Sequence, residues 1–295
     1  MRKPKSTKKG STNPRTKKTF SSKKKSFSAR GVSKKGKSTA TKKESAPVKK
    51  PTDEIRLNKY VANTGLCSRR EADKLIEQGK IKVNGKVISE LGTKVSIKDK
   101  ISFNGKPLKT QNHVYFLLNK PKNYITTTKD PKERKTVMHL MANVCKERIY
   151  PVGRLDRMTT GLLLFTNDGD TAKKLTHPSS EIQKMYTVDL NKNLKVSDLD
   201  KIKEGLELED GFATVDSIHF DGEKLNKKKL ILTLHSGKNR IIRRIFEHLD
   251  YTVVKLDRIY FAGLNKKDLP RGRSRALTQM EVNMLHMIKS KKGPA

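Results

Sequence analysis

At the start of the region from residue 53 to residue 112, apolar and polar positions follow one another with the spacing of a helix. Leu57, Tyr60 and Val61 stand at i, i+3 and i+4, which places them on one face of an α-helix. Gly65 follows as a residue that readily ends a helix. The pattern predicts a short helix with one buried face near the start of this region.

A second helix and two hairpins are predicted directly afterwards. Ser68 followed three residues later by Glu71 has the spacing of a capping box, which begins a helix. The inner face of this helix is expected to carry Ala72, Leu75 and Ile76. Asn84-Gly85 and Asn104-Gly105 interrupt short β-rich runs, and Asn-Gly is a strong signal for a tight hairpin turn. We expect two short helices packed on a small curled sheet.

From residue 113 to residue 290 the pattern changes to many short β-rich runs with few helices between them. The runs are Val114–Leu118, Ile149–Val152, Leu162–Thr166, Tyr186–Leu190, Thr214–Phe220, Leu230–Leu234 and Val253–Leu256. One helical pattern stands out, with Ile241, Ile242, Ile245, Phe246 and Leu249 on a single face. Strands interspersed with few helices predict an α+β domain on a mixed, largely antiparallel sheet.

The first 52 residues have a different composition, and here charge changes the picture. Residues 1–50 contain 19 Lys and Arg and a single acidic residue, Glu44, in a chain whose formal net charge is +37. Large apolar residues are almost absent, so this stretch cannot bury enough surface to offset its ordering entropy. We predict a disordered Lys-rich tail, either a tether that binds phosphates without sequence preference or a solvated segment that only aids solubility.

The overall composition points to a polyanionic partner in a reducing compartment. The excess of 67 Lys and Arg over 30 Asp and Glu favours nucleic acid, with an acidic membrane surface as the runner-up. The membrane alternative is weak because no run of about 18 apolar residues and no secretory signal occur. Two cysteines, Cys67 and Cys145, make neither a disulfide framework nor a metal set, so we expect a cytoplasmic protein.

The strongest chemical signal lies between Tyr150 and Gly169. A strand ends at Gly153, a polar loop presents Asp156 between Arg154 and Arg157, and an apolar strand resumes after the loop. Flanking arginines are expected to lower the pKa of Asp156 and keep it ionised as a nucleophile or base. Taken alone, an Asp after a strand is more often a turn former or a salt-bridge partner.

Two further segments carry candidate site residues. Alternation along residues 184–188 places Lys184 and Tyr186 on one strand face, where the tyrosine ring can stack on an extruded base or simply belong to the core. In residues 237–245, Asn239 is expected to cap a helix whose polar face carries three arginines. These are Arg240, Arg243 and Arg244. Arg240 or Arg244 could bind phosphate, helix geometry alone does not separate the three, and the bland alternative is a solvated helix face.

The small region resembles a known RNA-binding family. Its order of Leu-Asn-Lys-Tyr, Cys-Ser-Arg-Arg-Glu-Ala-Asp and Val-Asn-Gly over residues 55–105 is similar to the S-four-type (alpha-L) RNA-binding domain. The basic residues expected to contact the RNA backbone are Lys59, Arg69, Arg70, Lys74 and Lys80. The alternative, a DNA-binding helix-turn-helix, is disfavoured because the second helix is followed by a hairpin instead of a third helix.

The large region resembles the pseudouridine synthases of ribosomal RNA. Gly153-Arg154-Leu155-Asp156 followed by a Gly-Leu-Leu-Leu run is similar to their catalytic motif, and Leu117–Pro121 matches their first motif. The resemblance implies that Asp156 is catalytic, that Tyr186 stacks on uracil and that Arg243 pairs with Asp156. It also favours 23S ribosomal RNA as the substrate, with 16S ribosomal RNA as the runner-up, because residues 206–220 look like the large-subunit branch.

Two rival functions remain open at the level of sequence, and no cofactor is implied. A non-catalytic RNA-binding or ribosome-assembly protein would have no need of Asp156 in a pocket for a polyanion. A nucleoside or glycoside hydrolase usually needs two carboxylates, and the nearby Asp168 and Asp170 are expected to serve as turn and helix cap. The seven histidines form no metal-ligand set and no Gly-rich phosphate loop is present, so neither a metal nor a nucleotide cofactor is expected.

Overall fold

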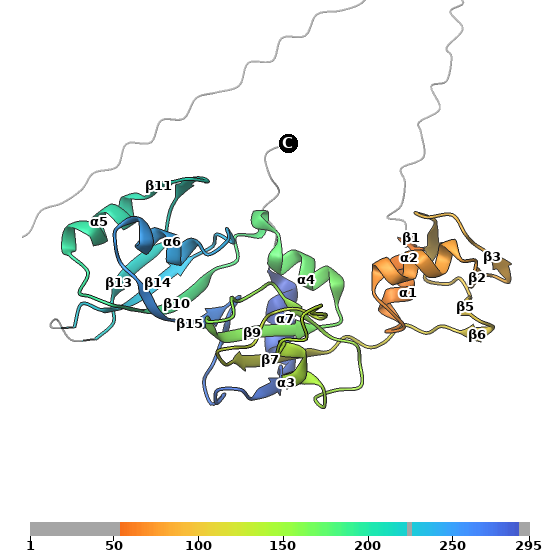
Figure 1. The fold of residues 1–295 in the computed structure, drawn as a ribbon. Coiled ribbons are helices and arrows are strands. Elements are labelled where there is room, and N and C mark those ends of the chain that lie inside the picture. Colours follow the sequence, from red (N-terminus) through yellow and green to blue (C-terminus); the bar gives the residue numbers. More distant parts are fainter. Residues whose placement is uncertain (1–53, 223–225, 289–295) are drawn as a thin grey trace, which may run out of the picture. The chain divides into compact units, whose positions relative to one another are not determined.

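A computed structural model describes residues 54–222 and 226–288 (Figure 1). The predicted Lys-rich tail of residues 1–52 lies outside the described residues. The elements of the first region are β1 (Glu54–Arg56), α1 (Leu57–Asn63), α2 (Arg69–Glu77), β2 (Ile81–Val83), β3 (Lys86–Val87), β4 (Lys94–Ser96), β5 (Ile101–Phe103) and β6 (Lys106–Pro107).

The two helices of the first region form where local sequence signals predict them. α1 buries Leu57, Tyr60 and Val61. α2 begins with a complete capping box, in which the Ser68 side chain accepts a bond from the Glu71 backbone and the Glu71 side chain accepts one from the Ser68 backbone. The predicted arrangement of these helices is confirmed.

The strands of the first region are set by its Asn-Gly turns. β2 and β3 pair around Asn84-Gly85, both with positive φ, and β5 and β6 pair around Asn104-Gly105 in the same way. Together they form a four-stranded sheet in the order β3-β2-β5-β6, while β1 pairs with β4 separately. An apolar cluster joins helices and sheet, and it consists of Leu57, Tyr60, Val61, Ala72, Ile76, Ile81, Val95 and Ile101.

The second region is built on one large sheet. Its strands are β7 (Tyr115–Lys120), β8 (Tyr150–Val152), β9 (Thr160–Thr166), β10 (Lys184–Leu190), β13 (Ser217–Phe220), β14 (Lys229–Leu234), β15 (Val253–Phe261), β16 (Leu264–Asn265) and β17 (Ser274–Ala276), with a separate hairpin of β11 (Leu206–Leu208) and β12 (Gly211–Ala213). Its helices are α3 (Val137–Met141), α4 (Gly169–Thr176), α5 (Val196–Glu204), α6 (Ile241–His248) and α7 (Gln279–Met287), with a 3-10 turn at Pro178–Ser180.

The large sheet is mixed and mostly antiparallel, as predicted. Its strand order is β13-β14-β10-β15-β9-β7-β17, with β16 beside β15 and β8 beside β9. The pairing of β9 with β15 is parallel and the others are antiparallel. In Figure 1 the part formed by β13, β14 and β10 carries α5 and α6, and the part formed by β9 and β7 carries α3, α4 and α7.

Strand β9 divides the core into two layers. All seven of its residues are buried, with Leu163 and Phe165 in the larger apolar cluster and Leu162 and Leu164 in the smaller one. Successive side chains of a strand point to opposite faces, so both faces of the sheet are covered here. The loop that precedes β9 is therefore anchored on the most deeply buried strand.

Two local predictions need correction. α6 begins at Ile241 with Arg240 as its N-cap at a φ of 47°, and the predicted cap Asn239 lies one residue further out. Asp168, predicted as a turn residue, is the N-cap of α4 and accepts bonds from the backbone of Asp170 and Thr171, whereas Asp170 is in the first helical turn. In both cases the N-cap of the helix lies one or two residues away from the position that the sequence pattern predicted.

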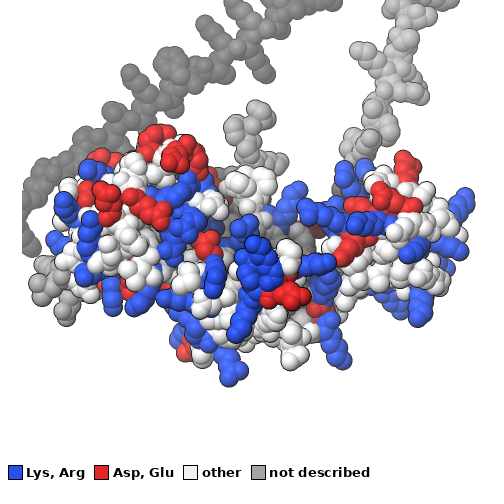
Figure 2. All heavy atoms as spheres, viewed as in Figure 1, with Lys and Arg blue, Asp and Glu red and all other residues white. Residues whose placement is uncertain are grey.

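Figure 2 shows Lys and Arg spread over the visible face, with Asp and Glu gathered in a few clusters. No helix within residues 54–222 and 226–288 is both long enough and apolar enough to span a bilayer.

Candidate active site

The loop that carries Asp156 lies between β8 and β9 and is fastened by the segment that follows β7. The Thr126 hydroxyl donates to the carbonyl oxygen of Leu155 at 2.7 Å and accepts from its backbone N–H at 3.3 Å. The backbone N–H of Asn123 donates to the carbonyl oxygen of Arg157 at 2.9 Å. Asp156 is thus held from both sides by backbone contacts, which is how a loop residue acquires a fixed position.

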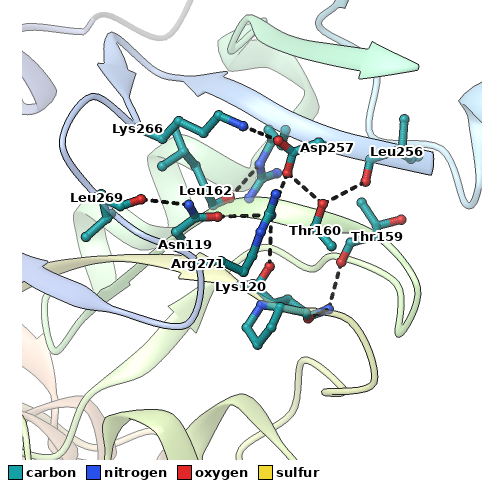
Figure 3. A network of polar contacts seen from close by, with 12 residues as sticks. Asn119, Lys120, Thr159, Thr160, Leu162, Leu256, Asp257, Lys266, Leu269 and Arg271 are labelled. Carbon is teal, nitrogen blue, oxygen red and sulfur yellow. Dashed lines mark hydrogen bonds and ion pairs between the residues drawn. The ribbon is translucent and has the colours of Figure 1, made fainter. Parts of the chain in front are cut away.

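A buried lysine from β7 fastens the same loop. Lys120 has no exposed surface, and its Nζ donates to the carbonyl oxygen of Thr159 at 2.8 Å (Figure 3). It also donates to the carbonyl oxygen of Asp156 at 3.0 Å. Burial lowers the pKa of Lys120 to about 8, against the opposing effect of Asp156. The carbonyl oxygens replace the hydrogen bonds to water that the ammonium loses on burial. The contact therefore stabilises the positions of both the lysine and the loop.

A second polar network lies next to Lys120 and joins three strands, β7, β9 and β15. Figure 3 shows Asp257 of β15 between Lys266, Arg271 and Thr160, with Arg271 2.7 Å and the Thr160 hydroxyl 2.6 Å from Asp257 Oδ1. Arg271 also donates to Asn119 at 3.1 Å. Burial would raise the pKa of Asp257, but hydrogen bonds from Arg271, Lys266 and Thr160 outweigh it and hold the pKa below its usual value. The network ties the start of β9 to β15 and to the segment after β16.

The three residues that the sequence predicts to be catalytic line one cavity. The cavity has a volume of about 910 Å³, and Asp156, Tyr186 and Arg243 all contribute to its wall. They come from the β8–β9 loop, from β10 and from α6. A volume in this range is typical of small-molecule sites and is ample for a nucleotide.

Arg243 is the arginine of α6 that faces this cavity. Its Nη1 donates to the carbonyl oxygen of Val253 at 2.8 Å, which fixes the guanidinium against β15. Burial and the neighbouring Arg240 lower the pKa of Arg243, while Asp156 and Glu247 act in the opposite direction. No ion pair joins Arg243 to Asp156 among the residues that the structure describes, so the two interact across the cavity without direct contact.

The other two arginines of this segment are tied to acidic residues. Arg244 makes two bonds to Asp210, at 2.6 and 2.9 Å, and does not line the cavity. Arg240 is exposed and donates to Glu247 at 3.2 Å. The structure therefore separates three arginines that the helical pattern left equivalent.

Tyr186 and Lys184 lie on β10 and point into the same cavity. Tyr186 is 8% exposed, and its backbone is paired with Arg258 of β15. Lys184 Nζ donates to the carbonyl oxygens of Ile182 at 3.0 Å and His235 at 2.5 Å. Burial and the positive charge of Arg258 lower the pKa of Lys184 to about 8. The alternation predicted for this strand is confirmed.

A second, more open cavity of about 590 Å³ adjoins the first at Asp156. Both cavities are lined by Arg154, Asp156 and Arg240, and the second also by Lys129 and Arg157. Lys129, Arg154, Arg157 and Arg240 are all exposed. This basic rim is suited to a polyanionic chain entering the site.

The basic residues predicted for the first region lie on its two helices and just after them. Arg69, Arg70, Lys74 and Lys80 are exposed, and Lys59 lies on α1. Arg69 donates to the side chain of Asn58 at 3.1 Å.

Two residues of the site were not assigned a role from sequence. Lys120 stood within a recognised motif, but nothing local indicated that its ammonium reaches the Asp156 loop. Arg258 was missed altogether, because the predicted run ended at Leu256 whereas the strand continues to Phe261. The apolar residues Ile259 and Phe261 are a signal that could have been followed. Within the described part of the chain, no group of three or more His, Cys, Asp or Glu side chains is arranged to hold a metal ion.

Comparisons with known proteins identify the family of each region. Residues 114–248 match the family described as RNA pseudouridylate synthase, and residues 55–101 match the S4 domain. A protein of Bacillus subtilis named ribosomal large subunit pseudouridine synthase B is 44% identical over 237 residues, which cover 79% of this chain and 96% of that protein. An uncharacterized RNA pseudouridine synthase of Aquifex aeolicus is 38% identical over 79% of this chain and 94% of its own length.

A solved structure shows the same fold. A crystal structure of a pseudouridylate synthase superposes with a TM-score of 0.55 at 28% identity, covering 78% of this chain and 99% of that one. The family match, the relatives and the fold therefore define an enzyme that acts on uridine in RNA. The chain belongs to the RNA pseudouridylate synthase family and carries an S4 domain.

Proposed function

We propose that this protein converts a specific uridine of large-subunit ribosomal RNA to pseudouridine, with Asp156 as the catalytic carboxylate. The observation that carries the proposal is that Asp156, Tyr186 and Arg243 line one cavity although they come from three separate elements. The relative in Bacillus subtilis is named for the large ribosomal subunit, which supports 23S over 16S ribosomal RNA as the substrate.

The reaction breaks the glycosidic carbon–nitrogen bond, turns the uracil in place and forms a carbon–carbon bond. The target nucleotide must first leave its stack to enter the cavity, which costs a few kcal/mol unless it is already unpaired. Asp156 acts on the sugar, by attack on the anomeric carbon or by removal of a sugar proton to give a glycal. The detached uracil stays in the cavity, where the surrounding side chains restrict access of water.

Tyr186 on β10 and Arg243 on α6 both support this reaction. The buried ring of Tyr186 offers a stacking face for the flipped uracil. Arg243 is held by the carbonyl oxygen of Val253 and pairs with the Asp156 carboxylate when the RNA is bound. Its fixed guanidinium keeps the carboxylate oriented toward the sugar.

RNA binding is divided between the two regions. Residues 53–112 act as an RNA-binding domain through Lys59, Arg69, Arg70, Lys74 and Lys80, and residues 113–290 form the catalytic domain. Around the catalytic cavity, phosphates of the target strand contact Arg154, Arg240 and Arg244. The substrate is ribosomal RNA or a pre-ribosomal particle, so we assign the activity to the cytoplasm.

The test is Asp156→Asn on transcribed 23S and 16S fragments. We expect pseudouridine formation to fall by at least about 10⁴-fold while RNA affinity stays within about threefold, because the carboxylate acts in the chemical step and not in binding. The matched control is Asp200→Asn, which alters an exposed carboxylate on α5 and should turn over like the wild type. Retained turnover in Asp156→Asn would contradict the assignment.

Product identity and substrate choice complete the test. Isomerisation leaves the mass of the RNA unchanged, whereas a hydrolase would release free uracil. Pseudouridine mapped in 16S and not in 23S fragments would move the substrate to the small subunit.

A further inference from the structure

Three buried polar atoms lack a hydrogen-bond partner among the described residues, and all three belong to residues of the same cavity. They are Thr159 Oγ1, Arg243 Nε and Arg258 Nη2. Buried polar side-chain atoms are paired in the great majority of cases, so an unpaired one calls for an explanation. Their concentration at one cavity indicates donors that are kept for a bound molecule.

Of the two arginines in this set, Arg243 and Arg258, Arg258 is the more deeply buried. Its residue is 3% exposed, its Nε donates to the carbonyl oxygen of Leu162 at 2.8 Å, and its guanidinium lies 4.6 Å from the centre of the Phe261 ring. Within residues 54–222 and 226–288, no carboxylate lies at ion-pair distance from it. A buried guanidinium without an anionic partner is unfavourable in the empty protein, and this suggests a role in binding.

The pairing of β15 with β10 places Arg258 next to the proposed position of the substrate base. Arg258 and Tyr186 are directly paired in the antiparallel ladder of β15 and β10, and the side chains of paired residues lie on the same face of a sheet. If Tyr186 stacks on the uracil, Arg258 lies beside the edge of that ring. Lys184, close enough for Arg258 to lower its pKa, adds positive potential at the same end of the cavity.

The base of the substrate is a better candidate than a phosphate for the group that accepts a hydrogen bond from Arg258. RNA phosphates belong to a chain that must return to solvent, and the exposed Arg154 and Arg240 stand at the rim where that chain would run. Arg258, by contrast, has almost no surface of its own. The group that reaches it is the part of the nucleotide inserted furthest, which is the uracil.

We propose that Arg258 Nη2 donates a hydrogen bond to a carbonyl oxygen of the target uracil and stabilises the leaving group. When the C1′–N1 bond breaks, its electron pair remains on uracil and is delocalised onto the ring oxygens. When C5 then bonds to C1′, the C5 proton is lost and N1 takes up a proton, so the composition is unchanged. A fixed donor aimed at a developing anion is a strong form of catalysis. This inference rests on the proposed function.

The first experiment compares Arg258→Met with the control Arg275→Met under single-turnover conditions on uridine RNA. Loss of one donor to a developing anion lowers rates by roughly 10²–10³-fold, so Arg258→Met should lose about that factor with RNA affinity within about threefold. Arg275 bonds to Glu281 and does not line the cavity, so its variant should keep the wild-type rate.

The second experiment separates leaving-group stabilisation from structural damage. In 5-fluorouridine RNA the leaving uracil is a more stable anion and needs less help from a donor. The rate of C–N bond cleavage in Arg258→Met, relative to the wild type, should therefore recover by about tenfold or more on this substrate. An equal loss on both substrates would overturn the proposal, because misfolding or misplacement affects them alike.

If Arg258→Met does not fold, the wild-type protein is assayed on 2-thiouridine and 4-thiouridine RNA. Sulfur is a weaker acceptor than oxygen, so cleavage should slow at the one position that Arg258 contacts, although thiouracils are more acidic. Rates unchanged or faster at both positions would overturn the proposal. Wild-type turnover of uridine RNA is measured in every series, and its absence would defeat the proposed function instead.

Discussion

Lys120 Nζ donates a hydrogen bond of 2.8 Å to the carbonyl oxygen of Thr159, and through this contact the buried end of β7 holds the loop of Asp156, the proposed catalytic carboxylate. The same ammonium reaches the carbonyl oxygen of Asp156 itself at 3.0 Å. An ammonium has three protons and no acceptor, so it can bridge several carbonyls where a neutral side chain cannot.

Replacing this lysine should therefore harm both stability and rate. We expect Lys120→Met to lower the free energy of unfolding by about 3 kcal/mol, because buried carbonyls lose their donor. The single-turnover rate should fall about 10²-fold, since a small displacement of a catalytic group has an effect of that size. Lys122→Met changes an exposed lysine nearby and should do neither. A wild-type rate in Lys120→Met would contradict the role of the contact.

The parallel pairing of β9 with β15 depends on a glycine. A Cβ on Gly161 would lie 2.2 Å from the backbone oxygen of Arg258, and its φ of +106° is unfavourable for other residues. Gly161→Ala should lose more than about 3 kcal/mol of unfolding free energy in denaturant titrations. Gly237→Ala meets no neighbour within 4 Å and should stay within about 1 kcal/mol of the wild type. Equal stability of the two variants would show that β15 can shift freely.

The stacking role proposed for Tyr186 predicts a difference between two substitutions. Tyr186→Phe keeps the ring and should retain the single-turnover rate within about fivefold, because stacking uses the aromatic face. Tyr186→Leu keeps apolar bulk but loses the ring, and should lose about 1–3 kcal/mol of interaction with the base, or roughly 10–100-fold in rate. If Phe and Leu variants are equally slow, the hydroxyl and not the ring carries the function.

An ion pair near the C-terminal helix predicts a pH dependence of stability. Hydrogen bonds from Arg275, aided by the backbone of Thr278, hold the pKa of Glu281 at about 2, below the ordinary 4.5. The stabilisation is complete above pH 4.5 and is lost as the pH falls toward 2, because the unfolded chain takes up the proton first. At pH 7 the free energy of unfolding of the wild type should exceed that of Glu281→Gln by about 1 kcal/mol. The difference is modest because the ion pair is partly exposed.

Chemical denaturation of both proteins at pH 7, 4 and 3 checks this prediction. The difference in unfolding free energy should shrink steadily over that series. A difference that stays constant would mean that the pair contributes through packing and not through the charge of Glu281.

Much of the local structure was determined by sequence alone. The capping box of Ser68 and Glu71 and the Asn84-Gly85 turn formed as predicted, since each is made by bonds between residues only a few positions apart. The β-rich runs of the large region were found because apolar alternation is a local property. The polar loop around Asp156 was recognisable for the same reason.

Other features were decided only by the tertiary structure. Three neighbouring arginines looked equivalent until the packing of α6 turned Arg243 into the cavity and left Arg244 on Asp210. Lys120 reaches Asp156 across 36 positions of the chain, and Arg258 reaches Leu162 across 96. Contacts of this kind depend on which strands pair and in what register, and that choice is made by burial of the whole core, so no short stretch of sequence contains it.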